Sequence, residues 1–155
     1  MAQMVLESPV ALKDYVGREI AVSDWLVVTQ ERINLFAEAT EDRQWIHIDR
    51  DRAAKESPFK TTIAHGFLTL SLISRFMQQT VKIRTGLRMA VNYGLNRVRF
   101  TAPVRSGASI RARIAVVSIK EIPGDALEAI YTVTIESEGS EKPCCVAESI
   151  VRYYS

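Results

Sequence analysis

Two histidines and one aspartate carry the proton chemistry that this sequence could perform near neutral pH. His47 and His65 are the only histidines of the chain, and Asp42 lies five positions before the first of them. A carboxylate and a neutral imidazole that converge can both accept hydrogen bonds from one water molecule. Either group can take its proton as the water attacks an electrophilic carbon. The pair therefore suits the addition or removal of water.

Gly66 directly follows His65 and opens an apolar segment that is expected to be helical. A glycine has no side chain to block a close approach to its backbone N–H. That N–H would lie at the end of the helix where the dipole favours negative charge. A thioester oxygen placed against it would have its developing enolate charge stabilised.

The same residue types also permit a structural interpretation. An aspartate and a histidine five positions apart in a loop are more often a cap and a structural hydrogen-bonding residue than a catalytic pair. His65 can be a partly buried residue satisfied by its neighbours, and Gly66 can be a turn position. Ser74, eight residues beyond Gly66, is by type a small polar residue that bonds back within its own helix. Spacing alone leaves both interpretations open.

The first half of the chain is expected to deliver the candidate acid and imidazole in an elaborated loop. Residues 8–17 predict a short helix-like segment, and residues 20–28 predict a strand. Thr29 can cap a helix whose apolar residues recur at three- and four-residue spacing. Residues 40–62 are polar and irregular, with a short helix capped by Asp49.

A buried helix and four long strands are expected to follow. Apolar residues cover most of the circumference of a helix over 66–80, which predicts that the helix is buried. The later segments are rich in Val, Ile, Tyr and Thr, and parts of them alternate. They span residues 89–100, 108–122, 127–136 and 144–153. Helices early and antiparallel strands late predict one α+β domain over residues 1–155.

Composition narrows the class of protein. The chain has 155 residues, 47% of them hydrophobic, and a net charge of +2, which does not favour a dedicated nucleic-acid binder. No apolar run is long enough to cross a bilayer and no secretory signal is evident, so a soluble, cytoplasmic protein is expected. Cys144 and Cys145 are adjacent and are expected to be reduced structural thiols.

Several linked motifs resemble those of one enzyme family. Residues 36–49, FAEATEDRQWIHID, and residues 62–72, TIAHGFLTLSL, resemble the signature of the MaoC-like hydratases. These are (R)-specific enoyl-CoA hydratases of the hotdog fold, and the likeness is nearest to the branch with NodN-like sequences. It continues through residues 91–100 and 103–104. The resemblance thus covers most of the chain from about Thr29 onward.

The resemblance implies a long central helix wrapped by a curved antiparallel sheet, usually in a dimer. It makes Asp42 and His47 the catalytic dyad that activates water and gives Gly66 the oxyanion N–H, with Ser74 and His65 supporting the site or the substrate. The implied reaction adds water to a trans-2-enoyl thioester to give the (R)-3-hydroxyacyl thioester, or reverses that step. No metal or redox cofactor is implied. Coenzyme A or an acyl-carrier protein enters only as part of the substrate.

The chain departs from the family pattern beside the dyad. Glu41 stands where the wider family often has Gly, and Gln44 and Trp45 replace Asn-Pro. The dyad spacing is intact, so hydratase chemistry is expected, with Trp45 affecting loop packing and the acyl chains that fit. Two alternatives remain: a hotdog acyl-CoA thioesterase, and a non-catalytic protein that binds acyl thioesters.

Overall fold

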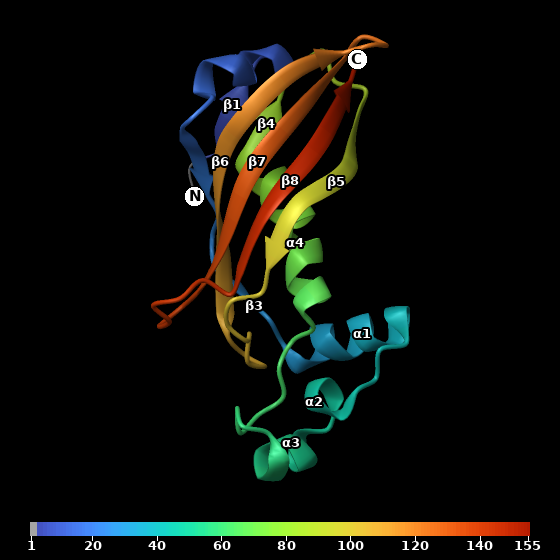
Figure 1. Ribbon diagram of the computed structural model, residues 1–155, viewed down its shortest axis with the longest axis vertical. Coiled ribbons are helices and arrows are strands. Elements are labelled where there is room, and N and C mark those ends of the chain that lie inside the picture. Colours follow the sequence, from blue (N-terminus) through green and yellow to red (C-terminus); the bar gives the residue numbers. More distant parts are fainter. Residues whose placement is uncertain (1–2) are drawn as a thin grey trace.

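Long antiparallel strands form one curved sheet (Figure 1). The computed structural model describes residues 3–155. The strands of the sheet are β2 (Glu19–Val22), β3 (Leu26–Val27), β5 (Met89–Arg99), β6 (Ser109–Ile122), β7 (Ala126–Ser137) and β8 (Cys145–Tyr154). Their order is β2-β6-β7-β8-β5, and β3 also pairs with β6. The four long strands expected in the second half are confirmed.

Alternation of side chains gives the sheet one apolar face. In β6, Ile110, Ala112 and Ile114 are fully buried, whereas the intervening Arg111 and Arg113 lie on the other face. Successive residues of a strand point to opposite sides, so this pattern fixes which face meets the core. The same alternation continues in β7 and β8.

Helix α4 (Gly66–Thr80) lies against this inner face (Figure 1). Its buried side includes Leu68, Leu72 and Phe76. The helix is buried along one side only and is therefore amphipathic, which corrects the expectation that it is buried. Phe67 is 70% exposed, and other positions on the same side are also exposed. The expected α+β fold, with a long helix wrapped by an antiparallel sheet, is confirmed.

The N-terminal half contains two differences from expectation. The segment over 20–28 is not one strand, because the chain leaves the sheet between β2 and β3. There, the Ser23 hydroxyl accepts a hydrogen bond from the Ala112 N–H at 2.9 Å. A parallel pair of β1 (Met4–Leu6) and β4 (Val81–Ile83) was not expected. The short helix over Pro9–Tyr15 is a 3-10 helix.

Three helices form a lobe beyond one end of the sheet (Figure 1). They are α1 (Gln30–Thr40), α2 (Trp45–Ile48) and α3 (Arg50–Glu56). The predicted caps are confirmed: Thr29 accepts from the Arg32 N–H at 3.1 Å, and Asp49 accepts from the Arg52 N–H at 3.0 Å. Within residues 3–155, no helix is sufficiently long and apolar to span a membrane.

Candidate active site

Asp42 is placed by the abrupt end of α1. The helix ends at Thr40, and the capping residue Glu41 has a left-handed backbone with φ 61°. The next residue turns back, and the Asp42 carboxylate accepts a hydrogen bond from the Gln44 N–H at 3.4 Å. Beside it, Arg43 pairs with Glu38 at 2.9 Å. The Asp42 side chain is therefore exposed at the mouth of the lobe with most of its acceptor capacity unused.

His47 lies on the short helix α2, whereas the sequence predicted a loop position. Its Nδ1 is 2.7 Å from the carbonyl oxygen of Ile63, which can only accept. Nδ1 therefore carries the hydrogen, and Nε2 of the neutral ring is left as an acceptor. The Ile63 N–H in turn donates to the carbonyl of Ile46 at 3.0 Å, so the segment before α4 fixes the orientation of the imidazole.

His65 contacts both members of the candidate dyad. Its Nε2 donates to the backbone carbonyl of Asp42 at 2.9 Å. Its ring stacks on that of His47, with centroids 3.8 Å apart and an interplanar angle of 23°. Phe36 packs against it at 4.9 Å. The Nδ1 of His65 is buried and has no hydrogen-bond partner among the described residues.

The surroundings of His47 favour its neutral form. Burial lowers the pKa of His47 below its usual value of 6.5. The hydrogen bond to Ile63 opposes this shift, the neighbouring His65 adds to it, and the charge of Asp42 opposes it. The net direction is downward. An imidazole that stays unprotonated near neutral pH can accept a proton from water.

Gly66 stands at the start of α4, next to His65. As the first helical residue, it has no carbonyl four positions earlier within the helix to occupy its N–H. A Cβ at this position would lie 2.8 Å from Cδ2 of Phe100, well inside normal contact distance. Glycine is therefore required by the close approach of an aromatic ring. The sequence indicated a role for the Gly66 N–H, but it did not indicate the contact with the Phe100 ring, which is 34 positions away in the chain.

Ser74 does not join this cluster within one chain. It lies eight residues beyond Gly66 on α4, about 12 Å along the helix axis. Its hydroxyl accepts from the Asn92 side chain at 3.1 Å, so it contacts β5. The structure thus brings Asp42, His47 and His65 together, with Gly66 next in sequence.

The three clustered side chains resemble a metal-ligand set by residue type. The donor atoms of Asp42, His47 and His65 all lie within 4.8 Å of one another. However, imidazole binds a metal through a lone pair in the plane of its ring. Because the two rings are stacked and nearly parallel, one ion cannot lie in both planes. The geometry fits this set to water and proton chemistry better than to chelation.

The two cysteines do not provide a nucleophile. Cys144 and Cys145 are both buried free thiols, as expected. Burial raises the pKa of Cys144 to about 12 and that of Cys145 to about 11. They therefore remain protonated and unreactive near neutral pH.

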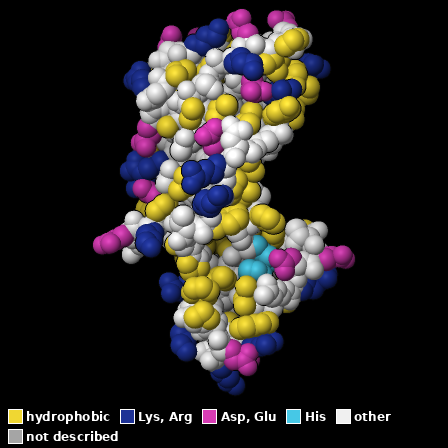
Figure 2. Space-filling view, viewed as in Figure 1, with side chains coloured by type: hydrophobic (Ala, Val, Ile, Leu, Met, Phe, Trp, Pro, Cys, Tyr) yellow, Lys and Arg dark blue, Asp and Glu magenta, His cyan; other side chains and the backbone are white. Residues whose placement is uncertain are grey.

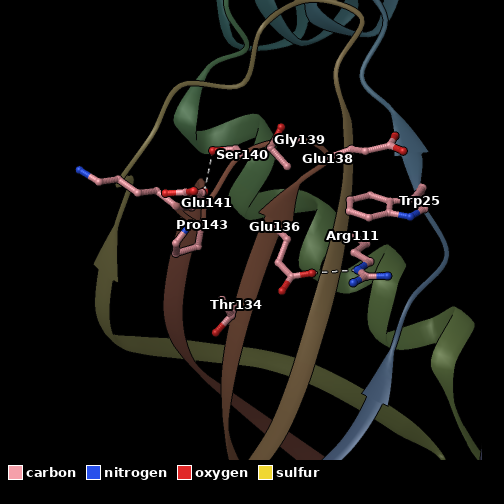
Figure 3. Close-up of a pocket in the computed structure, with 11 residues that line it drawn as sticks. Trp25, Arg111, Thr134, Glu136, Glu138, Gly139, Ser140, Glu141 and Pro143 are labelled. Carbon is pink, nitrogen blue, oxygen red and sulfur yellow. Dashed lines mark hydrogen bonds and ion pairs between the residues drawn. The ribbon is translucent and has the colours of Figure 1, made fainter.

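Two depressions in the surface, a recess at the histidines and a hollow beside Trp25, differ in the side chains that line them. Figure 2 shows the histidine surface in a recess between the sheet and the helical lobe, beside acidic and apolar side chains. A separate hollow on the outer face of the sheet is lined by Trp25, Arg111 and Glu136, with the loop between β7 and β8 (Figure 3). There, Arg111 pairs with Glu136 at 2.9 Å and stacks over Trp25 at 4.4 Å. These charged groups already satisfy one another.

Comparison with known proteins identifies the family. The model of the MaoC like domain matches residues 12–138. The 3-hydroxyacyl-thioester dehydratase Z of Mycobacterium tuberculosis is 50% identical over 147 residues, which covers 95% of this chain and 96% of that protein. Nodulation protein N of Rhizobium meliloti is 43% identical, covering 87% and 84%.

A solved structure supports the same fold. The unliganded R-hydratase PhaJ1 of Pseudomonas aeruginosa matches with a TM-score of 0.68 and 25% identity, covering 90% of this chain and 82% of that one. The hotdog fold and the family expected from the sequence motifs are both confirmed. The chain belongs to the MaoC-like domain family and is an enzyme of its hydratase and dehydratase class.

Proposed function

We propose that this protein is an (R)-specific enoyl-CoA hydratase that adds water to trans-2-enoyl thioesters and also catalyses the reverse dehydration. The observation that carries the proposal is the hydrogen bond from His47 Nδ1 to the Ile63 carbonyl. It leaves Nε2 as a proton acceptor beside the Asp42 carboxylate, at the N-terminal end of α4. The names of the dehydratase and R-hydratase relatives support the same reaction class.

In the proposed mechanism, Asp42 and His47 hold one water molecule between a carboxylate oxygen and Nε2. The dyad removes a proton as the water oxygen bonds to C3 of the enoyl group, and the C2=C3 electrons move onto the thioester carbonyl. The Gly66 N–H stabilises the resulting enolate oxygen. The dyad then returns a proton to C2, which completes the addition of one water molecule. Water held on one face of the substrate gives a single stereochemical product.

We assign His65 a positioning role in this mechanism. Its ring connects the backbone of Asp42 with the ring of His47, and the following residue is Gly66. A single side chain thereby supports the dyad close to the oxyanion N–H. Support from Ser74 stays a prediction, because it lies two turns farther along α4 in the same chain.

The substrate site is proposed to be completed by a second copy of the chain. Strand β5 is at the edge of the sheet and exposes apolar side chains that include Val91, Tyr93 and Leu95. Phe67 on α4 is also exposed. A long apolar edge strand favours pairing with another strand, and a two-fold dimer satisfies both copies at once.

The cytoplasmic location and the single-domain extent over 1–155 also remain predictions.

The test is hydration of short and medium-chain trans-2-enoyl-CoA by the purified protein, with chiral analysis of the product. We expect the (R)-3-hydroxyacyl-CoA at both lengths. Formation of the (S) product would contradict the proposed stereochemistry. Release of free CoA without hydration would favour a thioesterase, and saturable binding without product would favour a binding protein.

A further inference from the structure

A cavity lies between α4 and the inner face of the sheet. Its volume is about 210 Å³, and it adjoins a hollow of about 420 Å³ nearer the start of α4. Apolar side chains such as Met77 and Val151 form much of the lining. The residues that line both spaces are mostly polar: Ile73, Ser74, Asn92 and Ser149. The combined groove is thus apolar with a polar band across it.

Ser149 is a polar exception on the inner face of β8. Its neighbours on that face include Ala147 and Val151, and Ser149 itself is 7% exposed. Within residues 3–155, its hydroxyl has no hydrogen-bond partner. The hydroxyl still reaches solvent, since within the described residues His65 Nδ1 is the one fully buried side-chain polar atom without a partner. The Ser149 hydroxyl lines the cavity and is therefore available to hydrogen-bond a polar atom of a ligand.

A pair of tyrosines provides a second hydroxyl group, besides that of Ser149, that can donate a hydrogen bond into the cavity. The hydroxyls of Tyr131 and Tyr153 are 2.6 Å apart, and one donates to the other. Tyr131 is fully buried, whereas Tyr153 lines the cavity. If Tyr131 donates to Tyr153, both hydroxyls can be satisfied, because the Tyr153 O–H remains to donate into the cavity. The reverse arrangement would leave a donor without an acceptor in the core.

The side chains of Ser74 and Asn92 extend this polar band. Asn92 donates to the Ser74 hydroxyl at 3.1 Å, which leaves the Ser74 O–H and the Asn92 carbonyl oxygen available. The band therefore offers both donors and acceptors. An apolar pocket with a few placed polar groups selects ligands that carry matching polar atoms.

We propose that this cavity binds an acyl chain that carries a hydroxyl or oxo group along its length, and that Ser149 and Tyr153 are specificity-determining residues that hydrogen-bond this oxygen. The inference rests on the proposed hydratase function, since the acyl chain belongs to the thioester substrate. A plain alkyl chain of the same length would fill the apolar lining but leave the polar band unpaired.

The experiment compares kcat/KM for trans-2-dodecenoyl-CoA with that for analogues hydroxylated at successive positions from the middle of the chain to its end. We expect at least one hydroxylated analogue to be preferred by about tenfold or more. Ser149→Ala and Tyr153→Phe should each remove most of this preference. Ser118→Ala, a matched change on β6 outside both cavities, should retain it.

Crotonyl-CoA, too short to fill the groove, tests the proposed function separately. If it is hydrated and all long-chain substrates react alike, the inference is overturned and the proposed function stands. If neither crotonyl-CoA nor any long-chain enoyl-CoA is hydrated, the proposed function fails, and isothermal titration with saturated hydroxydodecanoyl-CoA and dodecanoyl-CoA still tests the cavity. Binding of a hydroxylated ligand that is about tenfold tighter would support the inference, and equal binding would overturn it.

Discussion

The recess at the histidines and the hollow beside Trp25 both contain polar groups but use them differently. In the hollow, Arg111 and Glu136 neutralise each other, and the arginine also covers the tryptophan ring. In the recess, His47 is buried with an unused acceptor, and His65 has a buried Nδ1 without a partner among the described residues. Polar groups that satisfy one another stabilise a fold, whereas groups held with spare capacity are available to a substrate.

Substitution of Asp42 or His47 is expected to have the largest effect, and it is the strongest test of this difference between the recess and the hollow. We expect His47→Gln and Asp42→Asn each to lower kcat for crotonyl-CoA hydration by about a thousandfold, because the amide that replaces either group cannot accept the proton of water. Glu136→Gln in the outer hollow is the matched control. Steady-state kinetics with circular dichroism will test this, and near-normal turnover in either dyad variant would reject the assigned roles.

The approach of Phe100 to Gly66 gives the next largest expected effect. Gly66→Ala would place a Cβ against the ring and displace either the N–H or Phe100. A small displacement of an oxyanion donor is expected to lower kcat/KM by about a hundredfold. The double variant Gly66→Ala/Phe100→Ala should recover part of that loss. If the single variant is fully active, the close packing at Gly66 has no catalytic role.

Substitution of His65 separates ring stacking from hydrogen bonding. His65→Phe keeps an aromatic ring against His47 but cannot donate to the Asp42 carbonyl, and we expect kcat to fall by about tenfold. Loss of His65 also removes one cause of the lowered pKa of His47. The acidic limb of the pH profile should therefore move to higher pH. An unchanged profile would argue against contact between the rings in solution.

The lowered pKa of His47 also has a consequence for stability. Because the unfolded chain binds the proton more readily, wild-type protein should lose stability relative to His47→Gln as pH falls from about 6.5 through the lower folded pKa. Above that range the difference should be constant. Urea unfolding of both proteins across this pH range measures it, and parallel curves would show that the pKa is not lowered.

Smaller effects, on the free energy of unfolding, are expected from substitutions of Glu41, next to Asp42, and of Glu136 in the outer hollow. Glu41 is left-handed, a conformation that glycine adopts without steric cost, and the wider family often has Gly there. Glu41→Gly should raise the free energy of unfolding by about 0.5–1 kcal/mol. In the outer hollow, Glu136→Gln should lower it by less than about 1 kcal/mol. Chemical denaturation checks both, and a destabilised Glu41→Gly variant would contradict the strain argument.

Local signals in the sequence predicted much of the fold. Alternation located β5 to β8, and the caps at Thr29 and Asp49 located two helix starts, because these patterns depend on near neighbours. The pairing of β1 with β4 joins segments about 77 positions apart, and no local pattern specifies it. The break between β2 and β3 depends on a bond from Ser23 to a distant strand.

The candidate site was predictable in its residue types but not in its contacts. The family motifs named Asp42, His47 and Gly66 from the sequence. The stack of His65 on His47 and the ring of Phe100 over Gly66 depend on tertiary packing, which the spacing of residues does not encode. The partner of His47 is a backbone carbonyl, which any residue at position 63 would supply.

The most direct test of the account is hydration of crotonyl-CoA in ¹⁸O-labelled water by wild-type protein and His47→Gln in parallel. The account predicts (R)-3-hydroxybutyryl-CoA with the label in its C3 hydroxyl, formed about a thousandfold more slowly by the variant. Equal rates for the two proteins, or release of CoA with the label in the carboxylate of the free acid, would contradict the proposed role of the dyad.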